Sequence, residues 1–232
     1  MLSELLSLFR SDNPLGVLAK NFAKMLRLAQ ELTMKAGTVY FGSGVPTPEE
    51  RTDIYKQDVK INKLERKIRK RVISHLTIAA NSQDVPYSLL LMSLVKDTER
   101  IGDYAKNLAE VDEIRPEPLP EDDIVAELRE IRAGVESGFA ETLKVFANSD
   151  HDEALELIRQ GRDFTHRCDN LVIRIARSDY DASTAAATIL GARYYKRITA
   201  HVLNILSSVV MPLHKIDYYD EKLLAIDDDE PA

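Results

Sequence analysis

Apolar residues recur at intervals of three and four along most of the chain, which is the spacing of one face of an α-helix. The same spacing runs through the stretches 13–38, 47–80, 87–111, 123–148, 151–177 and 183–213. In the first of them the apolar positions are Leu15, Leu18, Phe22, Met25, Leu28, Ala29 and Leu32. No stretch alternates apolar and polar residues for long enough to predict a β-strand. The pattern therefore predicts six long helices and an all-α fold.

Residues that begin or break helices separate these stretches. Asn13 and Pro14 suit the start of the first helix, and Thr47 with Glu50 can form a capping box at the start of the second. Residues 81–86 are predicted to be a loop. Three prolines fall within residues 115–120, and proline interrupts a helix because it lacks an N–H. We place the central linker there. N-caps of the last three helices are predicted at Asp122, Asp150 and Ser183.

The two halves of the chain share one layout of three helices, each of about 30 residues, as expected for up-down-up bundles. Arg100-Ile101 in the third helix recurs as Arg197-Ile198 in the sixth, and Asn107-Leu108 recurs as Asn204-Ile205. We predict two tandem three-helix repeats that arose by duplication, at residues 1–116 and 117–232. The second repeat ends in an acidic tail at residues 227–230, which we expect to be frayed.

Composition narrows the class of protein. The formal net charge is −7 and the pI about 5.4, which argues against nucleic-acid binding. The single cysteine, Cys168, excludes an intramolecular disulfide and suits a reducing compartment. The N-terminal residues 1–10 lack the basic start and long apolar core of a signal peptide, and no apolar run reaches the ~18 residues that span a bilayer. We expect a cytoplasmic protein that reaches a membrane only through a partner.

One segment of the third helix contains two features that destabilise an isolated helix. Glu99 and Asp103 stand four residues apart, so their like charges share one face of the helix, and Gly102 lies mid-helix, where it costs about 1 kcal/mol relative to alanine. Paired carboxylates suit a hard metal ion, and a glycine permits close helix approach. The structural alternative is that ordinary ion pairs neutralise the acids, with the candidate cations Lys96, Arg100 and Lys106.

The whole string Glu99-Arg100-Ile101-Gly102-Asp103, followed by Asn107 and Glu110, resembles the signature of the PhoU family. The resemblance implies two tandem three-helix bundles and a non-enzymatic cytoplasmic regulator of phosphate uptake. It also implies two partners, a phosphate ABC transporter and its sensor histidine kinase, and often a homodimer. Two alternatives remain open: an accessory protein of another ion transporter, or a metal-binding carboxylate bundle.

The resemblance also implies where metal would bind, because some PhoU proteins hold multinuclear iron or zinc clusters between acids of the second and third helices. The corresponding residues here are Asp58, Asn62, Glu99 and Asp103. Asn62 stands where the family has an acid. In the second repeat the residues that correspond to Glu99 and Asp103 are Lys196 and Ala200, and of that set only Asp169 is acidic. We therefore expect at most one metal site, in the first repeat.

The remaining charged or reactive residues show no catalytic pattern. The basic run 63–71 is expected to be a solvated helix face, and the alternatives are a docking patch for an acidic partner or anionic lipid, or a phosphate contact. The single cysteine reads as a core residue. No nucleophile elbow is present, and we expect no catalytic residues. Structural or surface roles are predicted for His75, His151, His201 and His214.

Overall fold

A computed structural model of the chain describes residues 14–42, 46–79, 82–115 and 117–217. Within these residues there are six long α-helices and no strand, so the all-α prediction is confirmed. The helices are α2 (Pro14–Tyr40), α3 (Pro48–Ala79), α4 (Val85–Ala109), α5 (Asp123–Asn148), α6 (His151–Ala176) and α7 (Ala182–Val210). Short 3-10 helices occupy Ser82–Asp84, Glu110–Glu113 and Leu213–Lys215. Among the described residues, no helix combines the length and the apolar character needed to cross a membrane.

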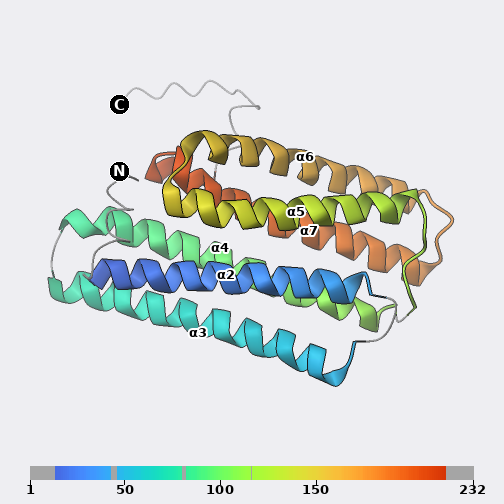
Figure 1. The fold of residues 1–232 in the computed structure, drawn as a ribbon, viewed down its shortest axis with the longest axis horizontal. Coiled ribbons are helices and arrows are strands. Elements are labelled where there is room, and N and C mark those ends of the chain that lie inside the picture. The colour runs from blue at the N-terminus through green and yellow to red at the C-terminus, as the bar shows by residue number, and fades with distance from the viewer. Residues whose placement is uncertain (1–13, 43–45, 80–81, 116, 218–232) are drawn as a thin grey trace.

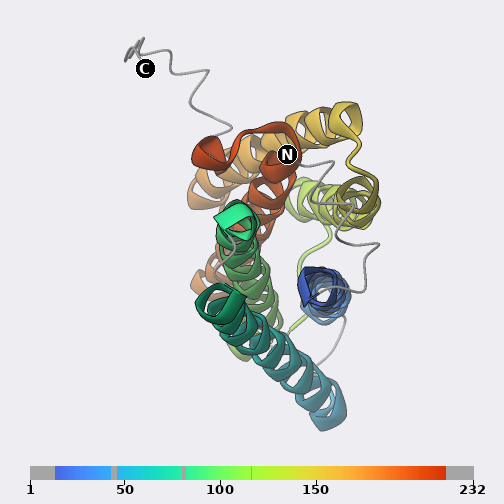
Figure 2. The same cartoon turned by 90° about the vertical axis from the view of Figure 1, so that its left-hand side faces the viewer.

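The six helices run side by side along the long axis of the molecule (Figure 1). Helices α2, α3 and α4 pack on one another, and so do α5, α6 and α7 (Figure 2). The two groups meet where α4 packs against α7 and α2 packs against α5. One hydrophobic cluster runs through both groups, with Phe22, Ile61, Leu108, Phe139 and Tyr195 among its members. The repeat boundary between residues 116 and 117 therefore stays a prediction.

The helix starts follow the local signals in most places. Thr47 and Glu50 form the predicted capping box: the Thr47 N–H donates to Glu50 Oε2 at 2.8 Å, and the Glu50 N–H donates to Thr47 Oγ1 at 3.2 Å. The Asp122 and Asp150 carboxylates cap α5 and α6 as predicted. The cap of α7 was predicted wrongly at Ser183. The carboxylate of Asp181 accepts from the first free N–H groups of the helix, because it lies two residues earlier and reaches both.

Other helix ends shift by one to three residues. Helix α4 begins at Val85, inside the predicted loop, and takes Pro86 into its first turn, where the missing N–H is not needed. It ends at Ala109 and continues as the 3-10 helix Glu110–Glu113. The predicted N-cap Asn13, the N-terminal segment 1–10 and the acidic tail 227–230 lie outside the described residues.

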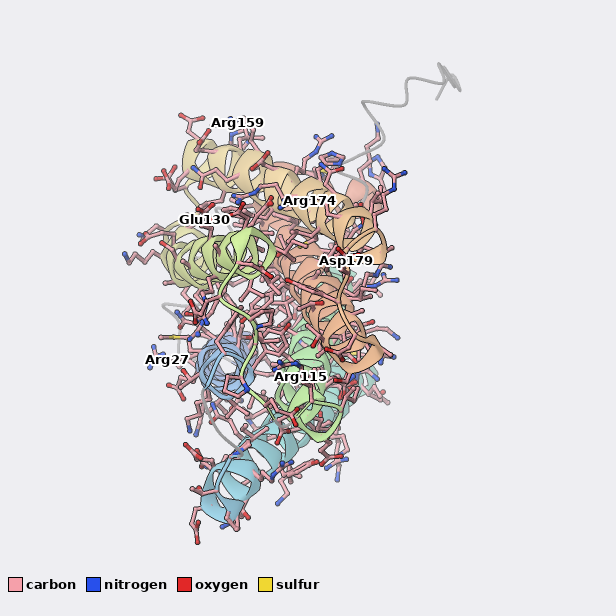
Figure 3. The ribbon with its side chains drawn as sticks, turned by 90° about the vertical axis from the view of Figure 1, so that its right-hand side faces the viewer. Arg27, Arg115, Glu130, Arg159, Arg174 and Asp179 are labelled. Atoms are coloured by element: carbon pink, nitrogen blue, oxygen red, sulfur yellow. The ribbon has the colours of Figure 1, made fainter. Side chains whose placement is uncertain are left out.

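Polar contacts connect the two groups of helices. The buried carboxylate of Asp97 on α4 accepts from Asn204 Nδ2 at 2.9 Å and lies 2.7 Å from His201 Nδ1, both on α7. At the start of the linker, Arg115 Nε donates to Thr184 Oγ1 of α7 at 3.0 Å. Figure 3 shows Arg115 at this junction between the groups. The predicted structural role of His201 is therefore a link between the two halves.

Candidate functional site between α3 and α4

The signature segment of α4 lies directly on α3, at the point where a glycine faces that helix. Gly102 and Ile61 are both buried. A Cβ atom added at Gly102 would lie 3.1 Å from Ile61 Cδ1, closer than most side-chain contacts, so that side chain would have to move by a few tenths of an ångström. The missing side chain therefore lets α4 approach α3 closely, and this places the charged residues around it opposite those of α3.

The second-helix residues of the site form a short polar chain with a lysine of α4. Asp58 is buried, with 6% of the residue exposed. Its Oδ2 accepts a 3.3 Å hydrogen bond from Asn62 Nδ2 and lies 3.4 Å from Lys106 Nζ. Two buried oxygens, Asp58 Oδ1 and Asn62 Oδ1, have no hydrogen-bond partner. The site therefore holds two acceptors that a water or a cation could satisfy.

The third-helix acids continue this chain. Asp103 Oδ1 lies 3.6 Å from Lys106 Nζ, so one ammonium group lies between Asp58 and Asp103. Asp103 Oδ2 accepts a 3.3 Å hydrogen bond from Arg100 Nη1, whose neighbouring Nε lies 3.8 Å from Glu99 Oε2. The structure therefore brings all four predicted residues into one connected group. Among the candidate cations, Arg100 and Lys106 pair with its acids, as the structural alternative predicted.

Burial and charge shift the pKa values of this group in a consistent direction. Burial is the main cause that raises the pKa of Asp58, and Lys106 opposes the shift. The pKa of Glu99 is also raised, first by burial and then by the charges of Asp103 and Glu65. Burial acts to lower the pKa of Lys106, but the nearby carboxylates outweigh it and the pKa is raised. The group is thus an excess of acids that one ammonium and one guanidinium partly neutralise.

The end of the signature segment is also fixed to α3. Tyr55 Oη donates to Glu110 Oε1 at 2.7 Å. One turn earlier, Arg51 forms ion pairs with Asp112 and with Glu113, the latter at 3.1 Å. Reasoning from the sequence missed these residues, because the contacts join positions about 55 to 62 apart and no local spacing marks them.

The fit of a metal can be judged from these donors. Within the described residues, no three carboxylate, histidine or cysteine side chains come close enough together to hold one ion jointly. The ammonium of Lys106 also takes the place between Asp58 and Asp103 where a cation would bind both. The side chains as arranged do not fit a multinuclear cluster. The two unpartnered oxygens of Asp58 and Asn62 are the feature that suits a single ion.

The equivalent place in the second repeat holds an ion pair. Lys196 Nζ on α7 lies 2.7 and 2.5 Å from the two carboxylate oxygens of Asp169 on α6, and Arg193 Nη1 lies 3.4 Å from Asp169 Oδ1. Further ion pairs join α5 and α6, including Arg167 with Glu130 at 2.8 Å. Glu130 and Arg174 lie on these neighbouring helices in Figure 3. Both repeats therefore place a lysine of their last helix against an acid of their middle helix.

Cys168 lies in the core as predicted. The residue is fully buried, and burial raises the pKa of its thiol to about 12. His75 contacts Asp84 at 2.7 Å near the start of α4, on the opposite end of α3 from the signature segment. Neither residue lies in the candidate site.

Comparisons with known proteins match the part of the chain that contains the candidate site. The family model described as "PhoU domain" matches residues 22–111, which cover α4 and its signature segment. A curated relative from Synechocystis, a "Phosphate-specific transport system accessory protein PhoU homolog", is 34% identical over 89 residues, which are 38% of this chain and 38% of that protein. The aligned part of the chain thus spans well under half the length of that relative.

Two crystal structures share the fold over most of the chain. PhoU from Pseudomonas aeruginosa aligns with a TM-score of 0.75 at 21% identity, covering 84% of this chain and 95% of that one. The phosphate transport system regulatory protein PhoU from Streptococcus pneumoniae aligns with a TM-score of 0.70 at 17% identity, covering 84% and 92%. At such identities the likeness concerns the fold.

Within the described residues, the fold is a bundle of six long helices, and α4 carries the signature segment. The comparisons support the resemblance seen in the sequence: the PhoU domain model matches residues 22–111, and the chain shares its fold with the two PhoU crystal structures over 84% of its length.

Proposed function

We propose that this protein is a cytoplasmic, non-enzymatic regulator of phosphate uptake and phosphate-starvation signalling. It binds a phosphate transporter, a sensor histidine kinase or both, and favours one state of the partner by binding that state more tightly. The observation that carries the proposal is the signature segment of α4 within the matched PhoU domain. The curated relative is described as an accessory protein of a phosphate-specific transport system.

The exposure of this segment supports a contact role. The side chains of Glu99, Arg100 and Asp103 are 20%, 46% and 27% exposed, so each presents a charge to solvent while it is held by neighbours. Side chains that are held in place lose less conformational entropy when a partner binds. The two-sign pattern also gives a partner complementary charges to recognise. The homodimer implied by the family resemblance stays a prediction.

A genetic experiment tests the regulatory role. A phosphate-starvation reporter is measured with abundant phosphate in a strain that lacks the gene, after complementation with wild-type protein, with Arg100→Gln or with Lys144→Gln as a control. Lys144 lies on α5, and its side chain is 67% exposed. We expect the reporter to be active without the gene, silent with wild type and Lys144→Gln, and partly active with Arg100→Gln.

A reporter that stays silent in the deletion strain would contradict the phosphate role. The second functional candidate would then be an accessory role for another ion transporter. Co-purification of a different transporter with the wild-type protein would identify it.

We propose, as a separate property, that the first repeat binds one iron or zinc ion. The two unpartnered oxygens of Asp58 and Asn62 support it, and Glu99 and Asp103 would complete the coordination of the ion after Lys106 moves aside. Elemental analysis of untagged protein tests this, with Glu99→Ala/Asp103→Ala compared to Asp152→Ala/Glu156→Ala. The control pair has the same spacing on the exposed face of α6. We expect stoichiometric metal in the wild type and in the control variant, and none in Glu99→Ala/Asp103→Ala. Absence of metal from all three proteins would contradict the proposed site.

A further inference from the structure

The exposed face of α3 carries a continuous stripe of cations. Five lysines lie on it at spacings of three and four: Lys56, Lys60, Lys63, Lys67 and Lys70. At 100° per residue they fall within about 80° of arc and extend over about 21 Å of helix. Arg66 and Arg71 are also exposed and lie at the two edges of the stripe. We call these seven residues the cationic face.

Most of the charge of the cationic face is not neutralised within the described part of the chain, although Asp53, which pairs with Lys35, also attracts Lys56 and Lys60. Between residues 54 and 77 no exposed position of α3 is acidic. Lys63, Lys67, Lys70 and the two arginines form no ion pair with any described residue. The nearest acid of the same helix, Glu65, pairs with Arg69 at 3.0 Å and is largely buried. The stripe therefore presents an uncompensated positive potential from Lys63 to Arg71.

The distribution of charge over the whole chain is equally uneven. Residues 1–113 contain 17 Lys and Arg against 15 Asp and Glu, a net charge of +2. Residues 114–232 contain 14 against 23, a net charge of −9. Because the protein as a whole is acidic, it would be repelled by a negative surface in most orientations. The cationic face of α3 offers an attractive approach, so the charge pattern also favours one orientation.

Apolar side chains accompany the cations. Ile73 is 60% exposed and Val59 is 45% exposed, the first at one edge of the cationic face and the second within it. Tyr55, 43% exposed, lies at the same edge as Ile73, with its hydroxyl bonded to Glu110. Helices that lie on a bilayer surface combine lysines and arginines with aromatic and aliphatic side chains that enter the head-group region.

We propose that the cationic face of α3 binds the surface of an anionic phospholipid bilayer. Helix α3 lies at an outer edge of the molecule (Figure 2), so its exposed face can meet a fluid surface whose head groups can move to each charge. Five of its seven cations are lysines. Lysine acts as a point charge, whereas a protein carboxylate partner would favour the bidentate geometry of arginine. A nucleic-acid backbone would offer the exposed Ile73 and Val59 no apolar contact, whereas the head-group region of a bilayer does.

This contact would also position the candidate site. Asn62 and Tyr55 lie on the flank of α3 that faces α4, next to the Arg66 and Ile73 edge of the cationic face. A protein that rests on a bilayer through α3 holds the signature segment beside the surface, within reach of a membrane-embedded client. The proposal departs from the expectation that a membrane is reached only through a partner, and it does not depend on which client is bound.

Vesicle co-sedimentation of the full chain tests the proposal. Binding is measured to vesicles of phosphatidylcholine alone and to vesicles that also contain phosphatidylglycerol. Each cation near an anionic surface strengthens partition about fivefold, so Lys63→Gln/Lys67→Gln/Lys70→Gln is expected to weaken binding about a hundredfold. The matched control Lys144→Gln/Arg177→Gln/Arg197→Gln removes three exposed cations of the acidic half and should bind as wild type does. Binding should fall steeply with added salt.

A second variant separates lipid from other polyanions. Ile73→Ser is expected to weaken vesicle binding several-fold, whereas Leu155→Ser, at a position of α6 that is 48% exposed, should not. The helical content of every variant is checked by circular dichroism. Equal binding to both kinds of vesicle, no loss in the triple α3 variant, or tighter binding to duplex DNA than to the anionic vesicles would each overturn the proposal.

Discussion

Lys106 is the residue whose replacement tests the electrostatics of the site most directly, because its ammonium group lies between Asp58 and Asp103. Replacing it by methionine keeps the aliphatic stem and the helix propensity but leaves Asp58 without a cation. At 3.4 Å and an effective dielectric constant of about 20, the attraction between the two charges is about 5 kcal/mol. Desolvation of the ammonium offsets much of this. We therefore expect Lys106→Met to lower the free energy of unfolding by about 1–3 kcal/mol at pH 7.

The pH dependence of this loss follows from the raised pKa of Asp58. A carboxyl whose pKa is higher in the folded than in the unfolded state binds more protons when folded, so its contribution to stability falls as pH rises through that interval. Without Lys106 the pKa of Asp58 rises further. The destabilisation should therefore be largest at neutral pH and shrink as the pH falls and the carboxyl becomes protonated.

Urea unfolding followed by circular dichroism, at pH 5 and pH 7, measures both effects. Asp58→Asn in the Lys106→Met background removes the uncompensated charge and should restore most of the lost stability; with Asp58→Asn alone as the fourth protein, the measurements form a double-mutant cycle. The reasoning is refuted if Lys106→Met is equally destabilising at both pH values and Asp58→Asn restores nothing. Stabilisation of Lys106→Met by added zinc would indicate that an ion can replace the ammonium.

Three further predictions concern packing and reactivity. Gly134→Ala should destabilise the protein by about 1–3 kcal/mol in chemical unfolding, because a Cβ would lie 2.1 Å from the ring of Phe164. Gly138→Ala in the same helix is the control: its Cβ would meet no atom within 4 Å, so it should stabilise the protein by roughly 0.5–1 kcal/mol. Cys168, buried and with its pKa raised to about 12, should react with a thiol reagent only under unfolding conditions, and rapid labelling of the native protein would contradict its placement. Asp97→Leu should cost about 1–3 kcal/mol, since its two polar partners on α7 lose a buried acceptor; thermal unfolding unchanged from wild type would show that this link is unimportant.

Most of the helical layout could be read from the sequence because its determinants are local. Apolar spacing placed the buried stripes of α2, α3 and α4, and side chains such as Thr47 and Asp122 set helix starts through donors two or three residues away. The prediction of Ser183 as the cap of α7 was wrong because spacing alone does not show which side-chain oxygen reaches the first free N–H groups of the helix. In the structure that oxygen belongs to Asp181.

The candidate site was predicted in part. The four residues came from the signature string and its counterpart on the second helix, and the structure brings them together. Their partners were harder to assign, since a lysine three residues from an acid can pair along its own helix or across to another. The crossing at Gly102 decides this for Lys106, which lies between Asp58 on α3 and Asp103 on α4.

The sequence by itself determined six amphipathic helices, the central linker and the family signature, because these depend on residue type and short spacing. Only the tertiary structure decided which charges face one another. Asp97 contacts His201 across 104 positions, and Lys196 pairs with Asp169 across 27. Such pairs depend on how helices cross. The free energy of burying apolar stripes sets those crossings, and it is nearly indifferent to which polar residues then meet.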